Sequence, residues 1–436
     1  MTGNACVITG AGIISPLGRG LAATSAALAR GQGGIVTISR FDTSGFPVRC
    51  AGEVADSNHD APIPQDHRRP EALARIALEE ALASAGLAPD TAPDPRRALS
   101  FALGKPTLDL ELLARQRSRW SQTSLTRARP GPARSPAEVL QVLPELQRQR
   151  EQTDASAVLP RLAAHAGAGG ERYSSYTACA SGNDAIGLGK RLIERGHADV
   201  VIAGASDCQV HPLSLLEFEL LSALSHEPAA TACRPFDRQR TGFVVGEGAA
   251  VVVLEAAAHA QRRHAPVLAH LAGYGSSLDS YGLTKCHPQG RGAALAMAAA
   301  LADAGLDPGA IGYINAHGTG TVLNDAAEAA AITRIWGASA QVAVSSTKSA
   351  TGHLLTAASA VEAVFTLLCL QDRLLPANLN FRQSDPDCTL NIVAVPTPAP
   401  ALDAAMSNGF GFGGQNSSLI LRLPAPLGGR RPARTA

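Results

Sequence analysis

The architecture can be inferred from two stretches of the sequence, SSYTACASGNDAIGLG at residues 174–189 and SSTKSATGHLLTAAS at residues 345–359. Each follows a strand-like run, continues as a polar loop that contains glycine, and enters an alanine-rich helical pattern. Their likeness predicts an internally duplicated α/β fold, with halves at residues 1–258 and 259–424. Residues 425–436 are predicted to form a tail.

The sequence around these stretches alternates between strand and helix patterns. The runs at 200–203 and 249–254 are almost wholly apolar and rich in valine, which is typical of strands buried on both faces and covered by helices. Further strands are predicted at residues 98–103, 173–178, 267–274, 312–315, 342–345 and 419–423, and helices at residues 70–86, 182–195, 292–304, 326–336 and 354–370.

Two other regions need separate interpretation. Residues 5–9 predict a strand that ends in a tight turn at Gly10-Ala11-Gly12. A dinucleotide-binding loop is the disfavoured alternative there, because the third glycine of that motif is replaced by Ser15. Residues 105–170 contain arginine-rich helical patches and a proline-rich break at 128–136, and we interpret them as an excursion from the core of the first half.

Composition excludes several classes of protein. Apolar residues make up 45% and charged residues 17% of the 436 residues, so a large core can form. The formal net charge of +1 gives no basic signature for nucleic acid. Eight scattered cysteines without a CxxC pair predict reduced thiols, a cytoplasmic location and no metal site. No signal peptide or membrane span is expected.

Four motifs contain candidates for chemistry. Cys179 is placed at the start of a helix, where the helix dipole is expected to lower the pKa of its thiol; a buried structural cysteine is the alternative. His317 follows a strand in a Gly/Thr loop, and it is either a ligand-contacting group or a loop hydrogen bonder. His353 comes shortly after Lys348, one of four lysines in an arginine-rich chain. The glycine-rich run at 407–416 is either a turn or a set of amides aimed at an anion.

In this order, the four motifs resemble the β-ketoacyl-[acyl-carrier-protein] synthases, in the Cys-His-His branch of the thiolase superfamily. The segments that carry the resemblance are ITGAGIISPLG, ACASGNDAIG, RPFDRQRTGFVVGEGAAVVVLE, NAHGTGT, SSTKSATGHLLTAASAVEA and NGFGFGGQN. The resemblance implies a thiolase-like, internally duplicated, five-layer αβαβα fold. It also implies an acyltransferase that condenses an acyl thioester with malonyl-acyl carrier protein and loses carbon dioxide.

The resemblance implies roles for individual residues. Cys179 would be the nucleophile, and His317 and His353 would stabilise the enolate formed by decarboxylation. Lys348 and Glu362 would be a charged pair that supports the histidines. The remaining implied residues are the backbone N–H groups of Cys179 and Phe412 as oxyanion hole, Phe412 as gate, and Thr284, Thr319, Thr321 and Phe410 as contacts for phosphopantetheine and substrate.

Further expectations concern relatives and partners. The 409–416 loop has no cysteine, whereas a thiolase would carry a second catalytic cysteine there. A chain-length-factor subunit, which is inactive, would lack the thiol that this chain has at residue 179. Departures such as Thr356 and Ser359 favour a specialised pathway, of polyketide or polyene type, over a housekeeping fatty-acid pathway. We expect no cofactor, an acyl carrier protein as partner, and either a homodimer or a heterodimer with a chain-length-factor-like subunit. The alternative function is a partner subunit with little activity alone.

Overall fold

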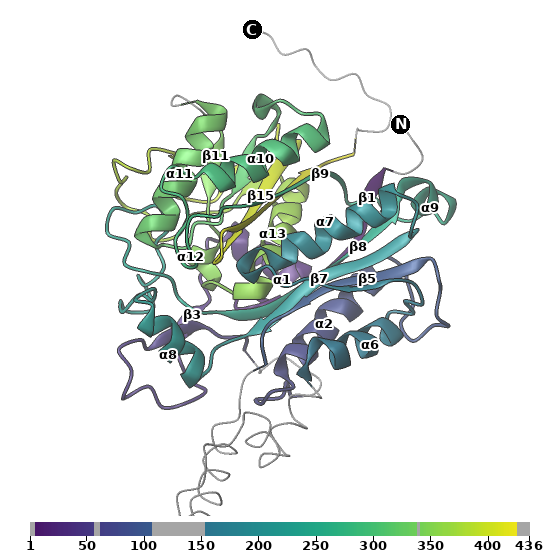
Figure 1. Ribbon diagram of the computed structural model, residues 1–436, viewed down its shortest axis with the longest axis horizontal. Helices are drawn as coiled ribbons and strands as arrows, with labels where there is room; N and C mark the ends of the chain where they lie inside the picture. Colours follow the sequence, from purple (N-terminus) through teal and green to yellow (C-terminus); the bar gives the residue numbers. More distant parts are fainter. Residues whose placement is uncertain (1–4, 56–61, 107–152, 338–340, 425–436) are drawn as a thin grey trace, which may run out of the picture.

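The computed structural model describes residues 5–55, 62–106, 153–337 and 341–424 (Figure 1). Ten of its strands form two sets of five. The first set is β1 (Cys6–Ser15), β5 (Arg97–Leu103), β6 (Arg172–Ser174), β7 (Val200–Cys208) and β8 (Glu247–Ala256). The second set is β9 (Ala269–Leu278), β10 (Tyr313–Asn315), β11 (Ala343–Ser345), β15 (Ala404–Gly411) and β16 (Gln415–Arg422). The remaining strands are β2 (Gly18–Arg19), β3 (Ile35–Thr37), β4 (Cys50–Gly52), β12 (Leu374–Leu375), β13 (Asn391–Ile392) and β14 (Thr397–Pro398).

The two sets have the same topology. The first is ordered β6-β5-β7-β8-β1 and the second β11-β10-β15-β16-β9, so each runs third, second, fourth, fifth, first. The three leading strands of each set are parallel, and the last two join them antiparallel. A short antiparallel contact between β1 and β9 makes one continuous sheet. The predicted duplication is confirmed at the level of strand order.

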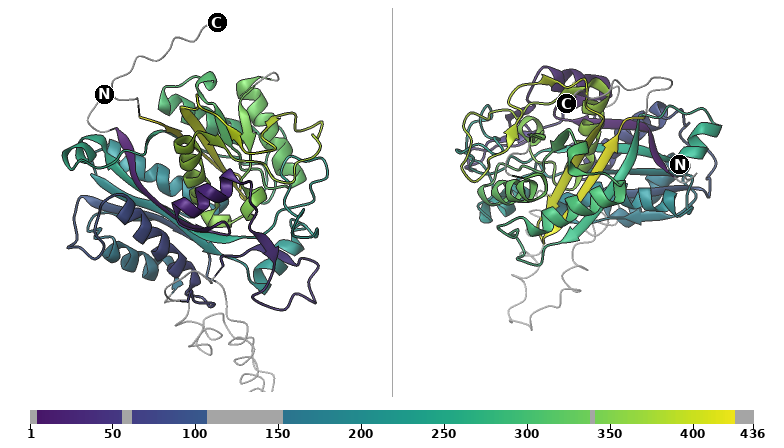
Figure 2. Two further views of the ribbon diagram at one scale, coloured as in Figure 1. Left: turned by 180° about the vertical axis from the view of Figure 1, so that it is seen from behind. Right: turned by 90° about the horizontal axis from the view of Figure 1, so that it is seen from above.

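Helices form three layers around the two half-sheets. The first half contributes α2 (Arg69–Ser84), α6 (Ala155–His165) and α7 (Ser181–Glu194), and the second α10 (Arg291–Ala304), α11 (Val322–Trp336) and α13 (Ala358–Asp372). Helices α2 and α6 cover one outer face, α10 and α11 the other, and α7 packs against α13 between the half-sheets (Figures 1 and 2). This is the predicted five-layer αβαβα arrangement. The shorter helices are α1 (Leu21–Ala29), α8 (Pro212–Leu220), α9 (Ala257–Arg262) and α12 (Lys348–Thr351).

The central helix α13 is buried along almost its whole length. Its residues from Ala358 to Leu370 are all buried. Within the described ranges, Leu355–Asp372 is the one helical segment long and apolar enough to cross a membrane, and 89% of it is buried inside the protein. The segment is therefore explained as the central layer of this fold.

The turn predicted at Gly10-Ala11-Gly12 is wrong, because β1 runs through all three residues. A Cβ on Gly10 would lie 2.4 Å from the carbonyl oxygen of Ala81, and one on Gly12 would lie 2.1 Å from that of Ala77. Both alanines are on α2. The glycines therefore permit close approach of a helix to a strand, which a sequence pattern does not distinguish from a turn.

Other predicted elements are present with shifted ends. The strand expected at 173–178 ends at Ser174, because residues 178–180 form a 3₁₀ turn that leads into α7. Most of the predicted excursion at 105–170, including its arginine-rich and proline-rich parts, lies outside the described residues, as does the tail at 425–436. Helix α6, which lies near the C-terminal end of this excursion, packs on β5 and β6.

Candidate active site

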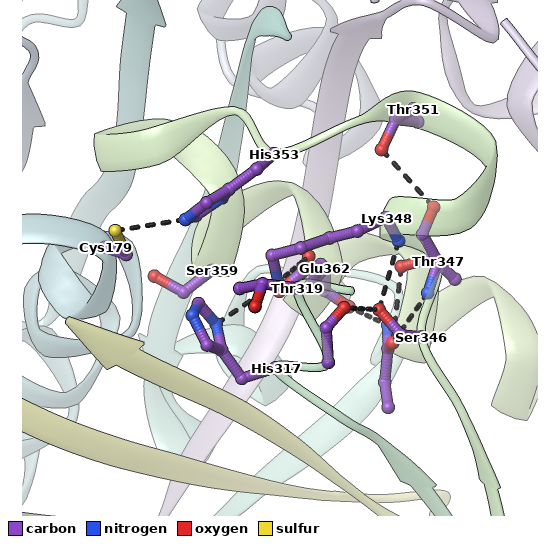
Figure 3. A network of polar contacts seen from close by, with 12 residues as sticks. Cys179, His317, Thr319, Ser346, Thr347, Lys348, Thr351, His353, Ser359 and Glu362 are labelled. Atoms are coloured by element: carbon purple, nitrogen blue, oxygen red, sulfur yellow. Dashed lines mark hydrogen bonds and ion pairs between the residues drawn. The ribbon is translucent and has the colours of Figure 1, made fainter. Parts of the chain in front are cut away.

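Three loops, one from the first half-sheet and two from the second, bring the predicted site residues together (Figure 3). Cys179 follows β6 and precedes α7, His317 follows β10, and His353 follows β11 and α12. Ala178 has a φ of 48°, a left-handed conformation that is uncommon for a residue with a side chain. This sharp turn places the thiol at the N-terminus of α7, close to the loops of the second half.

His353 contacts the thiol directly. Its Nε2 lies 3.1 Å from Cys179 Sγ, and its Nδ1 accepts a hydrogen bond from the backbone N–H of Leu355 at 3.3 Å. A neutral imidazole has one N–H, so a donor facing Nδ1 leaves the proton on Nε2. The histidine backbone is held against the segment that leads into β8, because its N–H donates to the Val244 carbonyl at 2.6 Å. The ring therefore presents an N–H donor at the sulfur.

His317 is oriented by a buried ion pair. Lys348 Nζ lies 3.2 Å from His317 Nδ1 and 2.5 Å from Glu362 Oε1. An ammonium group only donates, so it too leaves the imidazole proton on Nε2. The His317 and His353 rings are 5.2 Å apart at an angle of 81° (Figure 3). The predicted Lys348–Glu362 pair is thus present, behind the two rings.

Burial controls the protonation of the three groups. It lowers the pKa of both His317 and His353 well below the usual value, and the positive charge of Lys348 lowers them further. Both rings are therefore neutral near pH 7. Burial raises the pKa of the Cys179 thiol to about 12, against the opposing effects of Lys348 and the Phe412 N–H. The prediction that the helix N-terminus lowers this pKa is wrong, since burial of the sulfur outweighs it.

The remaining predicted residues surround the same space. A cavity of about 610 Å³ is lined by Cys179, His317, His353, Phe410, Phe412, Thr284, Thr319 and Thr321. Lys348 and Glu362 are buried beside it and do not line it. The backbone N–H of Phe412 hydrogen-bonds the Cys179 sulfur, and Gly411 lies against the same turn, where a Cβ would be 3.0 Å from the Cys179 nitrogen. Thr319 and Thr321 share a hydrogen bond of 2.8 Å.

Sequence reasoning missed the carboxylates that hold the loops. Glu328 accepts hydrogen bonds from the backbone N–H groups of His317 at 2.9 Å and Gly318 at 2.7 Å, and burial raises its pKa to about 7. Asp325 accepts from the N–H of Thr319 at 3.0 Å. Both are buried on α11, one turn apart. An Asp and a Glu three residues apart near the start of an apolar helix were the available signal.

Comparison with known proteins assigns the family. The protein-family model described as Beta-ketoacyl synthase, N-terminal domain matches residues 4–260, and the family model of the C-terminal domain matches residues 268–382. A 3-oxoacyl-[acyl-carrier-protein] synthase 2 of Staphylococcus aureus is 35% identical over 425 residues, covering 95% of this chain and 100% of the relative. A synthase of the same name from Synechocystis sp. is 36% identical over 426 residues, covering 95% of this chain and 97% of the relative.

Solved structures agree with the sequence comparison. A type II polyketide ketosynthase, in complex with its acyl-carrier protein and bound to the hexaketide, has a TM-score of 0.83 at 29% identity, covering 97% of this chain and 99% of that one. The ishigamide ketosynthase/chain length factor has a TM-score of 0.81 at 31% identity, with coverages of 97% and 99%. A β-ketoacyl synthase from Burkholderia phymatum also has 0.81 at 31%, with coverages of 97% and 100%. On these matches, and with the thiol and two histidines in one cavity, the chain belongs to the β-ketoacyl synthase family.

Proposed function

We propose that the protein condenses an acyl group, held on Cys179, with malonyl-acyl carrier protein to give a β-ketoacyl product and carbon dioxide. The observation that carries the proposal is the joint geometry of the thiol and two neutral histidines, each with its proton on Nε2. Cys179 attacks the incoming thioester carbonyl, and its proton leaves with the departing pantetheine thiol. The N–H groups of Cys179 and Phe412 are suited to the tetrahedral oxyanion, since the latter already points at the sulfur.

The condensation step uses the histidines. When the C–C bond to the malonyl carboxylate breaks, carbon dioxide leaves and the electron pair forms an enolate. Its oxygen accepts hydrogen bonds from Nε2–H of His317 and of His353, and neutral rings donate without giving up a proton. The enolate carbon then attacks the acyl thioester and expels the Cys179 thiolate. Every step uses side chains and backbone groups of the protein, so we propose that no cofactor takes part.

We propose an acyl carrier protein as the substrate carrier, with its phosphopantetheine arm along Thr284, Thr319, Thr321 and Phe410, which line one cavity with the thiol. One similar structure is a ketosynthase in complex with its acyl-carrier protein, and others are ketosynthases together with a chain length factor. Those neighbours support a specialised, polyketide-type pathway for this chain, with fatty-acid synthesis as the alternative. We also propose that it acts in the cytoplasm.

We propose that the protein is a dimer, formed with a second copy or with a chain-length-factor-like subunit. Strand β6 is the edge of the sheet, and its three residues are exposed. An exposed edge strand offers unpaired backbone groups to another chain. Sedimentation of the purified protein tests this, and a monomer at micromolar concentration contradicts a stable homodimer.

The function is tested by incubating the protein with a panel of acyl-carrier-protein thioesters and measuring its intact mass. Wild type should gain one acyl group, and Cys179→Ala should gain none. Because Cys286 also lines the cavity, the adduct must be located by peptide mapping. An adduct on Cys286, or equal labelling of the alanine variant, contradicts the assignment of the nucleophile. No adduct from any thioester favours a subunit that needs a partner for activity.

A further inference from the structure

An ion pair lies on the wall of the cavity that the first half contributes. Lys105 follows β5, Glu217 is on α8, and their side chains form a salt bridge. Both residues line the same cavity as Cys179. The side chains are 43% and 55% exposed, so the pair is solvated. None of the chemistry proposed above uses it.

A buried glutamine holds both partners of the pair. Gln209 is 1% exposed, and its Nε2 donates to the backbone carbonyl of Lys105 at 2.8 Å. Its Oε1 accepts from the hydroxyl of Ser214 at 2.7 Å. Ser214 lies one turn before Glu217 on α8, so one side chain fixes the segment of the lysine and the helix of the glutamate. The pair therefore differs from two long side chains that meet by chance on a surface.

Apolar side chains also line the cavity that holds the thiol and the ion pair, among them Phe218, Leu221 and Leu355. The Phe218 ring lies 5.3 Å from that of Phe243, which in turn lies 5.4 Å from that of His353. Thr284, Thr319 and Thr321, which we assign to the phosphopantetheine arm, come from the second half of the chain. An acyl group on Cys179 that extends into the first half runs along these apolar side chains and then meets the charges.

We propose that the Lys105–Glu217 pair is a polar end wall that makes the acyl site discriminate against long alkyl chains. The inference rests on the proposed function, because it concerns the acyl group that Cys179 carries. An alkyl chain that reaches the pair displaces water from two charges and returns no hydrogen bond, which is costly. Short acyl groups stop before the pair, and chains that carry oxygen there can hydrogen-bond to it. The substrate class is thus short or oxygenated acyl groups.

The test compares butyryl- and decanoyl-pantetheine thioesters as acyl donors and measures the rate of adduct formation on Cys179 by peptide mapping. For wild type, the butyryl rate should exceed the decanoyl rate by about tenfold or more, the factor that 1.4 kcal/mol of desolvation gives. The double variant Lys105→Met/Glu217→Leu should reduce that ratio about tenfold by speeding the decanoyl reaction. The charge-swapped variant Lys105→Glu/Glu217→Lys should keep the wild-type ratio.

A matched control removes another exposed ion pair. Arg161 and Glu71 form a salt bridge between α6 and α2 and do not line the cavity, so Arg161→Met/Glu71→Leu should leave both rates unchanged. Equal butyryl and decanoyl rates in wild type, or an unchanged ratio in Lys105→Met/Glu217→Leu, overturn the proposal while the synthase function stands. If neither thioester acylates wild type but a carrier-protein thioester does, the same ratios are measured with that carrier. If no donor acylates Cys179, the proposed function and this inference fail together.

Discussion

The two halves of the molecule share one strand order but supply different chemistry. The loop after the third strand carries Cys179 in the first half and Lys348 and His353 in the second. The loop after the second strand carries Lys105 in the first half and His317 in the second. Duplication therefore explains the scaffold, and differences between equivalent loops explain why one half holds the thiol and the other holds the two histidines.

Both halves use glycines to bring a helix close to a strand. Gly10 and Gly12 let β1 approach α2, and Gly273 and Gly275 do the same for β9 and α10. A Cβ on Gly273 or Gly275 would lie 2.2 Å from a carbonyl oxygen of α10, close to the distances found in the first half. The two halves therefore share the close contact between helix and strand, whereas the residues of their equivalent loops differ.

The largest expected effect is that a variant in each half of the molecule loses a different step of the reaction. Cys179→Ala should abolish acyl transfer but still release carbon dioxide from malonyl-acyl carrier protein. His317→Ala should reduce that release about 100- to 1,000-fold, the usual loss when one oxyanion donor is removed, and still allow acylation. Mass spectrometry of the protein measures acyl transfer, and the release of labelled carbon dioxide from radiolabelled malonyl-acyl carrier protein measures decarboxylation. If both variants lose both steps equally, the division of labour is wrong.

The next effect concerns a fully buried ion pair in each half. Lys348→Met leaves the Glu362 carboxyl buried without its cation and should lower the free energy of unfolding by about 3–5 kcal/mol. Arg69→Met should cost less, because Arg40 still pairs with Glu247. Denaturant midpoints measure both. Lys348→Met/Glu362→Leu should recover stability without recovering activity, and recovery of activity would contradict the role of Lys348 in orienting His317.

Glycine substitutions test whether the helix–strand contacts of the two halves are equivalent. Gly12→Ala and Gly275→Ala should each lower the free energy of unfolding by about 1–3 kcal/mol, since either Cβ collides with helix backbone. Gly45→Ala is the control, because a Cβ there meets nothing within 4 Å. A large cost in only one half would show that the two helix–strand contacts are not equivalent.

The smallest expected effect is a pH dependence of stability. Burial raises the pKa of Glu328 from 4.5 to about 7, so the folded state binds more protons than the unfolded state between these values. Its contribution to stability is present below pH 4.5 and is lost as pH rises through about 7. Glu328→Gln should therefore gain stability relative to wild type between pH 5 and pH 8, on the order of 1–2 kcal/mol. An unchanged difference between the two pH values would mean that Glu328 is ionised throughout.

Sequence reasoning succeeded where chemistry and structure are local. Cys179, His317 and His353 stand in short motifs at strand ends, so both the repeat and the cavity residues could be predicted. It failed where distant elements meet. The pKa of Cys179 depends on burial by both halves, and the role of Gly12 depends on α2. The Lys105–Glu217 pair joins residues 112 positions apart, which no local pattern records.

The pairing of β1 with β8 has a consequence for synthesis on the ribosome. More than 230 residues separate the end of β1 at Ser15 from the start of β8 at Glu247, and β1 pairs with β8 along almost its whole length. At about 5–20 residues per second, roughly 10–50 s pass before that partner strand emerges. For that time an apolar ten-residue strand lacks its neighbour and can bind other nascent chains. The first half must therefore complete its core late, and chaperone capture of β1 is expected during translation.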